Sequence, residues 1–343
     1  MKFGLFGGAR QGGDAGQASD SHPFHEFIDY VCEAETLGFH SVFLVEHHFT
    51  GLGQVSASLG LLTFLAARTT RMRLGTAVVV LPWHNPVLLI EQAATLDLLS
   101  KGRFDFGIGR GYRGNEFEGF CIPIEEADER YEEAIAIIRK AWSGKTGASK
   151  GRFSHQGKRW KFDNIVVEPA PVQHPHPPLW AGAASERSIR KAAEEGFNLL
   201  LAQHGAPEVI GKQVATYREA VTGLGRKFDP MSVGVTRALH ITHTAAEREE
   251  AHRLRQEFLA GNRVLARPSG GAPAAGFLKD FSSAEEMRKA TEADALIGPP
   301  EEIVARLEQY RAAGVEYMLL TDVACSREAL RTFAREVMPA FAE

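Results

Sequence analysis

The chain has 343 residues, of which 44% are hydrophobic, and its formal net charge at pH 7 is -4. Such a chain can bury a large core without disulfides or structural metals, and its charge gives no electrostatic basis for binding nucleic acid or an anionic membrane. The 3 cysteines lie far apart without a CxxC pattern, and we expect neither a signal peptide nor a membrane span. We therefore expect a cytoplasmic protein whose partner is a small molecule.

Strand-like runs alternate with helix-like segments along the whole chain. The predicted strands are Lys2–Phe6, Ser41–Val45, Met72–Val80, Phe104–Ile108, Pro178–Ala181, Asn198–Leu201, Ser232–Ile241 and Tyr317–Thr321. The predicted helices are Phe24–Leu37, Ser58–Thr69, Pro86–Leu99, Ala127–Trp142, Ser185–Glu195, Pro207–Leu224, Ala245–Leu259, Pro300–Ala313 and Ser326–Val337. A glycine follows three of these helices, in "LGF", "EGF" and "AGV", where a helix should end before the next strand.

This alternation predicts an α/β fold, a single (β/α)₈ TIM barrel over residues 1–343. An open doubly wound sheet would carry its dinucleotide fingerprint after the first strand. Here the first strand runs instead into a glycine-rich loop, "GGARQGGDAGQASDSHP".

Two inserted segments interrupt the repeat. Residues 144–177 contain a predicted hairpin in "FSHQGKRWKFDNIVV", and residues 261–298 contain "RPSGGAPAAGF" followed by charged residues. Long insertions in a compact barrel are usually binding loops or lids. We expect the second insertion to be a mobile lid, with a plain surface loop as the alternative.

The second strand ends in "SVFLVEHHFTG", which places three polar side chains, Glu46, His47 and His48, at the active-site end of a barrel. Adjacent residues of an extended chain point to opposite sides, so the two imidazoles would not share a metal ion. We expect no metal site. An acid/base or hydrogen-bonding role for one imidazole, and a purely structural role for the pair, both remain open.

Two further strand ends suggest phosphate binding. "FDFGIGRGY" places Arg110 beside glycine backbone donors, and "WAGAASERSIRKAAEEG" places Ala183, Ala184 and the predicted N-cap Ser185 at the start of a helix. An ordinary tight turn and an ordinary helix start are the respective alternatives. Four aromatic residues could line an apolar substrate pocket or simply pack in the core: Phe6, Trp83, Tyr112 and Trp180.

Four segments together resemble the luciferase-like flavin-dependent monooxygenases, the superfamily of the bacterial luciferase subunits. They are "EHHFTG", "RLGTAVVVLPWHNPV", "EQAATLDLLSKGRFDFGIGRGY" and "PPLWAGAAS". The resemblance covers roughly residues 1–225 and resumes near "GPPEEIVARLEQYRAAGVEYMLL". It implies the same barrel that the periodicity predicts.

The resemblance also implies roles for individual residues. His47 matches the family's catalytic imidazole, Glu46 lies near the same flavin ring, and His48 matches a subunit-interface residue. Ala77 and Val78 match a non-proline cis peptide bond that supports the flavin ring. Arg110 and the turn formed by Ala183, Ala184 and Ser185 match the phosphate-binding elements. Gly109 departs from the pattern, because it stands where the luciferase catalytic subunit has a reactive cysteine.

The implied function is an FMN-dependent monooxygenase that uses reduced flavin and dioxygen to oxygenate a small, apolar organic substrate, an aldehyde or ketone. No nicotinamide fingerprint is present, so a separate flavin reductase would supply the reduced FMN. The implied assembly is a homodimer. Two alternatives stay open: a deazaflavin- or FMN-dependent hydride-transfer oxidoreductase, and a non-catalytic relative that binds flavin or a fatty acid.

Overall fold

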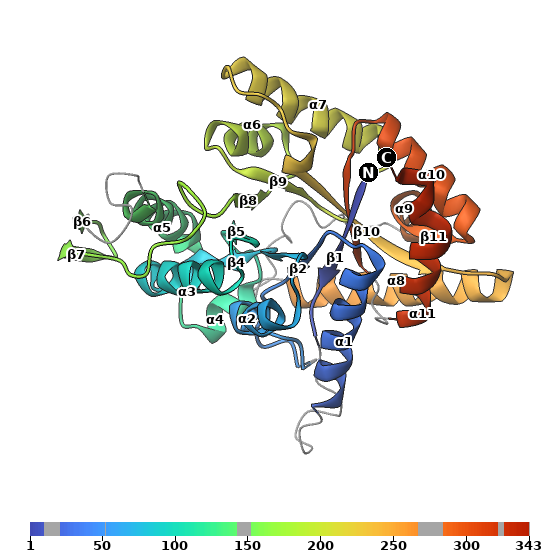
Figure 1. Ribbon diagram of the computed structural model, residues 1–343, viewed down its shortest axis with the longest axis horizontal. Helices are drawn as coiled ribbons and strands as arrows, with labels where there is room; N and C mark the ends of the chain where they lie inside the picture. The colour runs from blue at the N-terminus through green and yellow to red at the C-terminus, as the bar shows by residue number, and fades with distance from the viewer. Residues whose placement is uncertain (10–20, 52, 143–151, 267–283, 322–325, 343) are drawn as a thin grey trace.

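Parallel strands follow one another around a closed barrel in the computed structural model, which describes residues 1–9, 21–51, 53–142, 152–266, 284–321 and 326–342 (Figure 1). In order around the barrel, the strands are β1 (Lys2–Gly7), β2 (Ser41–Leu44), β3 (Arg73–Thr76), β5 (Phe104–Gly109), β8 (Leu179–Gly182), β9 (Asn198–Leu201), β10 (Val233–Ile241) and β12 (Tyr317–Thr321). The pairing of β12 with β1 closes the ring. The predicted eight-stranded TIM barrel is confirmed.

Helices surround the barrel (Figure 1). Their bounds are α1 (His22–Leu37), α2 (Ser58–Arg68), α3 (Pro86–Leu99), α4 (Gly114–Gly119), α5 (Ala127–Trp142), α6 (Glu186–Glu194), α7 (Pro207–Gly223), α8 (Ala245–Ala266), α9 (Ala284–Asp294), α10 (Pro300–Ala312) and α11 (Arg327–Thr332). Short turns η1 (Leu81–Trp83), η2 (Ile124–Glu126) and η3 (Pro230–Ser232) connect them, and η4 (Phe333–Val337) and η5 (Met338–Phe341) follow α11. Gly38, Gly196 and Gly314 follow three helices with φ of 95°, 75° and 90°, as the sequence predicts.

The apolar core has two layers, because parallel barrel strands are buried on both faces. The larger layer lies between the barrel wall and the helices. The smaller one fills the barrel interior and consists of Phe43, Trp180, Leu200, Tyr317 and Leu319. A polar floor lies beside it, where Arg73 pairs with Asp105 at 2.6 Å and the Trp180 indole donates to the same carboxylate at 3.0 Å.

The prediction of a single third strand over Met72–Val80 is wrong. β3 ends at Thr76, the Ala77–Val78 peptide is cis, as the resemblance implied, and a separate β4 (Val79–Val80) then pairs with β5. Thr76 is held at the break, because its hydroxyl donates to the Gly107 carbonyl at 2.7 Å. The apolar run "AVVV" conceals this break, since periodicity reports apolar content and not peptide geometry.

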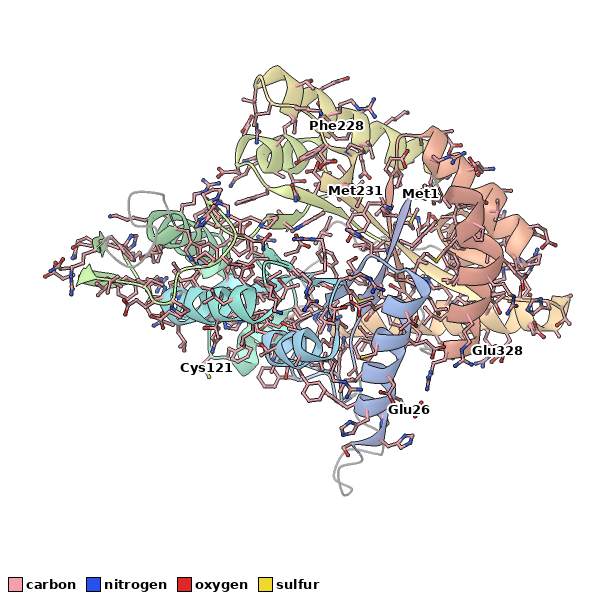
Figure 2. The ribbon with its side chains drawn as sticks, in the orientation of Figure 1. Met1, Glu26, Cys121, Phe228, Met231 and Glu328 are labelled. Atoms are coloured by element: carbon pink, nitrogen blue, oxygen red, sulfur yellow. The ribbon has the colours of Figure 1, made fainter. Side chains whose placement is uncertain are left out.

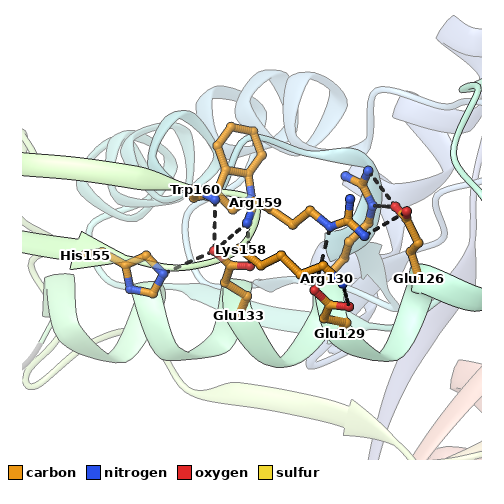
Figure 3. Close-up of polar contacts among 8 residues, drawn as sticks. All are labelled: Glu126, Glu129, Arg130, Glu133, His155, Lys158, Arg159 and Trp160. Carbon is orange, nitrogen blue, oxygen red and sulfur yellow. Dashed lines mark hydrogen bonds and ion pairs between the residues drawn. The ribbon is translucent and has the colours of Figure 1, made fainter.

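Both insertions carry regular structure. In residues 144–177, β6 (Phe153–Gln156) and β7 (Lys161–Ile165) form the predicted antiparallel hairpin. Glu133 on α5 holds the hairpin turn, since its carboxylate accepts the backbone N–H of Arg159 and of Trp160 and contacts His155 (Figure 3). In residues 261–298 the sequence prediction missed α9 and β11 (Leu296–Gly298), and the middle of the expected lid, 267–283, lies outside the described residues.

Helix α8 is the longest helix of the described chain and is longer than predicted. Its residues contact β10, β11 and α9, and near its far end it contacts α4, which follows β5 (Figure 1). At 1.5 Å per residue, a helix of this length spans about 33 Å. α8 therefore links structure that follows β5 with structure on the β10 side of the barrel.

None of the helices in the described ranges is both long enough and apolar enough to cross a bilayer. Two cysteines in those ranges are free thiols: Cys32 is partly buried, and Cys121, just after α4, is exposed at the edge of the molecule (Figure 2). Cys325 lies outside the described residues.

Gly107 allows β5 to approach the end of β3, because a Cβ at Gly107 would lie 1.8 Å from the Thr76 carbonyl oxygen. Gly107→Ala should therefore destabilise the protein by about 1–3 kcal/mol through overpacking. Gly182→Ala is the matched control, because a Cβ there meets nothing within 4 Å. Chemical denaturation of both variants measures the difference; equal stabilities would contradict this account of the β3–β5 contact.

Candidate functional site

A buried carboxylate, Glu116 on α4, gathers the polar groups at the carboxyl end of β2. Its Oε1 accepts the His48 backbone N–H at 2.9 Å and lies 3.1 Å from His47 Nδ1. Arg113, which precedes α4, brings its Nη1 to 3.7 Å from the same oxygen. Glu116 and Arg113 are each only 2% exposed, so these groups interact in a medium of low polarity where their charges are weakly screened.

The His47 ring is held neutral. Burial lowers its pKa below the ordinary value, and the positive charge of Arg113 adds to this, while the hydrogen bond to Glu116 acts in the opposite direction. A carboxylate can only accept, so a neutral ring donates Nδ1–H to Glu116 and leaves Nε2 as an unprotonated acceptor. This arrangement provides a positioned base at the mouth of the barrel.

Glu46 is committed to protein groups. Its Oε2 accepts the Val80 backbone N–H at 2.6 Å, and its Oε1 lies 2.8 Å from His84 Nε2 and 3.2 Å from His48 Nε2. Burial would raise the pKa of Glu46, but these hydrogen bonds outweigh it and hold the pKa below the usual range. Glu46 thus joins the end of β2 to β4, directly after the cis peptide.

The two histidines turn to different neighbours, as an extended backbone requires. His47 meets Glu116, whereas His48 meets Glu46 and a group of aromatic rings. The ring of Trp83 lies 5.3 Å from that of His48, 5.6 Å from that of Phe117 and 5.2 Å from that of Phe120. The Trp83 indole nitrogen is buried and has no hydrogen-bond partner among the described residues.

The other expected pocket residues occupy different positions. Tyr112 is half-buried, with the Arg113 guanidinium 5.7 Å from its ring centroid. Phe6 is half-buried against the inner core cluster. Trp180 is 4% exposed within that cluster and donates to Asp105, so the structure supports the core-packing alternative for this residue.

The expected phosphate-binding groups follow two neighbouring strands, since β5 pairs with β8. Arg110 is exposed and pairs with Asp128 at 3.1 Å. Ser185 caps α6, as predicted, in a capping box: its Oγ accepts the Ser188 N–H, and the Ser188 hydroxyl contacts the Ser185 nitrogen at 3.1 Å and the Ala184 nitrogen at 3.3 Å. Ala183 is half-buried, and Ala184 and Ser185 are exposed.

A second polar group lies near the carboxyl ends of β9 and β10. Arg255 on α8 is 1% exposed and donates to Gln203 at 2.8 Å. Burial, with the nearby charge of Arg255, lowers the pKa of His240 at the end of β10 to about 4. The His240 Nε2 and the buried Thr321 hydroxyl have no hydrogen-bond partner among the described residues. Unpaired buried polar atoms at this end of a barrel mark a surface that can bind a ligand.

Sequence reasoning missed Glu116, Arg113 and His84. The sequence did offer a signal for each, because they lie in or beside motifs already singled out. Arg113 and Glu116 come just after "GRGY", and His84 lies within "LPWHNP". Their pairing with His47 and Glu46 required the fold, because 69 and 38 residues separate the partners in sequence.

Two other kinds of site are not supported. Within the described ranges, no group of three or more histidine, cysteine, aspartate or glutamate side chains could hold a metal ion. An open groove of about 690 Å³ between α8 and α9 is lined mainly by charged side chains. Several of these pair with one another, Arg253 with Glu250 and Arg288 with Glu249, so the groove is a solvated surface and not the chemical centre.

A closed barrel with polar side chains gathered at the carboxyl ends of its strands defines a (β/α)₈-barrel enzyme. The chain belongs to the luciferase-like monooxygenase family, whose model matches residues 1–317. It is therefore an enzyme of the flavin-dependent monooxygenase class, in a family that uses a flavin or the deazaflavin F420.

The relatives agree with this assignment. The oxygenase component of flavin-dependent trigonelline monooxygenase from Acinetobacter baylyi (strain ATCC 33305 / BD413 / ADP1) is 29% identical over 365 residues, covering 100% of this chain and 96% of the relative. The structure of monooxygenase RslO1 from Streptomyces bottropensis matches with a TM-score of 0.81 and 26% identity over 100% of both chains. The oxygenating constituent of 3,6-diketocamphane monooxygenase from Pseudomonas putida, in complex with FMN, shares the fold, with a TM-score of 0.75 at 19% identity over 99% of this chain and 98% of that one.

His240 should make the protein acid-sensitive. Its pKa is about 4 in the folded chain, against an ordinary 6.5, so as the pH falls below 6.5 the unfolded state takes up the proton first and stability is lost. His240→Gln should make the free energy of unfolding fall less steeply with decreasing pH, by at most about 1.4 kcal/mol per pH unit. Denaturation at pH 7 and pH 5 measures the change, with the exposed His25→Gln as control. An unchanged pH dependence in His240→Gln would contradict the assignment.

Proposed function

We propose that this protein is the oxygenase of a two-component system, an FMN-dependent monooxygenase that uses reduced FMN and dioxygen to oxygenate a small organic substrate. The observation that carries the proposal is His47, a partly buried, neutral imidazole held by Glu116 at the barrel mouth. The two-component assignment is supported by the relative named as the oxygenase component of a flavin-dependent monooxygenase, and FMN in particular by the resemblance of the site motifs.

The residues present fit FMN. The exposed Arg110 guanidinium and the α6 start at Ser185 follow neighbouring strands and would hold the phosphate. Within the described part of the chain, Arg110 pairs with Asp128 in an exposed ion pair, which exchanges at little cost. Ala77 and Val78 are partly exposed at the break between β3 and β4 and would support the flavin ring. When bound in reduced form, FMN supplies the electrons and the reaction with dioxygen.

The chain's own residues position groups, move a proton and exclude water. The Nε2 atom of His47 would accept and return a proton, while Glu116 fixes the ring through Nδ1. Glu46 holds β4 against the end of β2 through the Val80 N–H, which keeps the Ala77–Val78 edge in place. The rings of Trp83, Phe117 and Phe120 form an aromatic wall beside His48 and would limit access of water from that side of the strand end.

The proposed partners are a small organic molecule, dioxygen and a flavin reductase. An apolar aldehyde or ketone suits the aromatic wall, and Phe6, Trp83 and Tyr112 remain the proposed pocket residues. Absorbance of the bound cofactor and oxygen consumption separate this function from deazaflavin- or FMN-dependent hydride transfer. A bound flavin with no turnover of an aldehyde, ketone and sulfonate panel would instead favour a non-catalytic binding protein.

Replacing the His47 imidazole should separate chemistry from binding. His47→Ala removes the proposed base and should lower the rate of substrate oxygenation by about 10²–10⁴-fold, the usual contribution of a positioned acid/base group. Affinity for FMN should change little. Single-turnover assays with reduced FMN measure the oxygenation rate, and fluorescence titration measures the affinity for FMN. His25→Ala is the control. Normal oxygenation by His47→Ala would contradict the role of this residue.

We propose a homodimer that buries the outer faces of α2 and α3. These packed helices expose large apolar side chains: Phe64 is 47% exposed, Leu88 55% and Leu99 56%. Phe49, beside His48, is 56% exposed. Contiguous exposed apolar side chains mark association surfaces, and a dimer here is consistent with the interface role implied for His48.

Charges on this surface should separate the subunits. The double variant Leu88→Glu and Leu99→Glu would bury two unpaired carboxylates in the interface and should give a monomer at low micromolar concentration. Leu224→Glu, at a residue 51% exposed beyond α7, is the matched control and should leave the assembly unchanged. Sedimentation velocity gives the masses. A double variant that remains dimeric would place the interface elsewhere.

A further inference from the structure

Arg113 is a buried arginine with few hydrogen-bond partners among the described residues. The residue is 2% exposed, and its Nε and Nη1 atoms have no hydrogen-bond partner among the described residues. Its Nη2 makes one long contact, 3.4 Å, with Asn262 Oδ1 on α8. A guanidinium carries five N–H donors, so this one is removed from water with most of its donors unused.

Three other arginines with buried or partly buried guanidinium groups have most of their donors paired within the protein. Arg237 donates to Tyr310 and to the backbone carbonyls of Ala202, Thr236 and Gly205. Arg103 donates to four backbone carbonyls and to the Thr69 hydroxyl. Arg73 forms a two-point ion pair with Asp105. Arg113 differs from these three, because two of its guanidinium nitrogens have no hydrogen-bond partner among the described residues.

Arg113 lies at the chemical centre. Its Nη1 is 3.7 Å from the Glu116 oxygen that holds His47 Nδ1 and the His48 N–H. A second unused donor, the Trp83 indole N–H, belongs to a ring that packs on Phe117, the residue after Glu116. The unpaired donors therefore lie around the same short helix, α4, that positions the proposed base.

The chemistry of these donors favours an anion with a planar, two-oxygen head. A guanidinium fork matches a carboxylate in two-point geometry. Glu116 shares its Oε1 among three neighbours and approaches Arg113 no closer than 3.7 Å, so it leaves the guanidinium incompletely paired. The proposed FMN phosphate groups, Arg110 and the start of α6, are separate residues, and Arg110 is exposed and paired with Asp128.

We propose that the substrate carries a carboxylate and that Arg113 binds it beside His47. This inference rests on the proposed function, because both use the same site. It replaces a purely apolar aldehyde or ketone as the expected substrate with an organic acid that has an apolar body. The aromatic wall would contact that body. Asn262, on α8, would report occupancy of the site, since its 3.4 Å contact with Arg113 is the bond that an incoming carboxylate would replace.

Calorimetric titration tests the proposal without turnover. FMN-loaded protein is titrated with acids and their shape-matched amides: benzoate and benzamide, phenylacetate and phenylacetamide, 2-naphthoate and 2-naphthamide, octanoate and octanamide. At least one acid should bind more tightly than its amide by about tenfold or more, the ratio expected for a charge-assisted pair. Amides that bind as well as acids in every pair would overturn the proposal, and this comparison needs no variant.

Variants then assign the preference to Arg113. Arg113→Gln should abolish the preference for acids, and Arg113→Lys, which keeps the charge, should retain part of it. Arg110→Gln is the control: it should weaken FMN binding and leave the preference intact. A preference that survives in Arg113→Gln, or a loss of FMN affinity with the preference unchanged, would overturn the proposal. Protein that binds acids through Arg113 but never oxygenates them would contradict the proposed function alone.

Discussion

The hydrogen bonding of one carboxylate, Glu116, organises the catalytic end of this barrel. Its Oε1 holds the backbone of His48 and the ring of His47, and it lies beside the Arg113 guanidinium. A buried carboxylate is costly unless its charge is compensated, and here compensation comes from a neighbouring cation and backbone and ring donors. The outcome is a fixed and neutral imidazole whose second nitrogen is available, which is what proton transfer at neutral pH requires.

A second carboxylate, Glu46, performs a related task on the other side of the same strand end. It joins β2 to β4 through the Val80 N–H and holds His48 and His84 through its other oxygen. The two carboxylates thus use the alternation of an extended chain, with His47 turned to one and His48 to the other. Glu46 thus supports the shape of the site, next to the position that the resemblance implies for the flavin ring.

Much of the fold could be predicted from the sequence, because the eight parallel strands are buried on both faces and appear as apolar runs. The break at Ala77–Val78 could not be derived from periodicity, since "AVVV" is uniformly apolar, and it was anticipated only through the resemblance. Helix α4 and strand β11 are too short, at 6 and 3 residues, for a periodic signal. For the site, the strand-end rule selects His47 and Glu46, but Glu116 and Arg113 emerge only when α4 folds back onto β2.

Arg113 differs from Arg237 and Arg103 in how its guanidinium group is hydrogen-bonded. Arg237 and Arg103 donate mainly to backbone carbonyls, which is how a folded chain accommodates a buried charge. Arg113 sits between α4 and α8 with donors unused, next to the proposed base. Preorganised donors of this kind lower the stability of the free protein. They strengthen binding, because they need no rearrangement when the ligand arrives. The same carboxylate that fixes His47 therefore leaves Arg113 short of a partner, which links positioning of the base to recognition of the substrate.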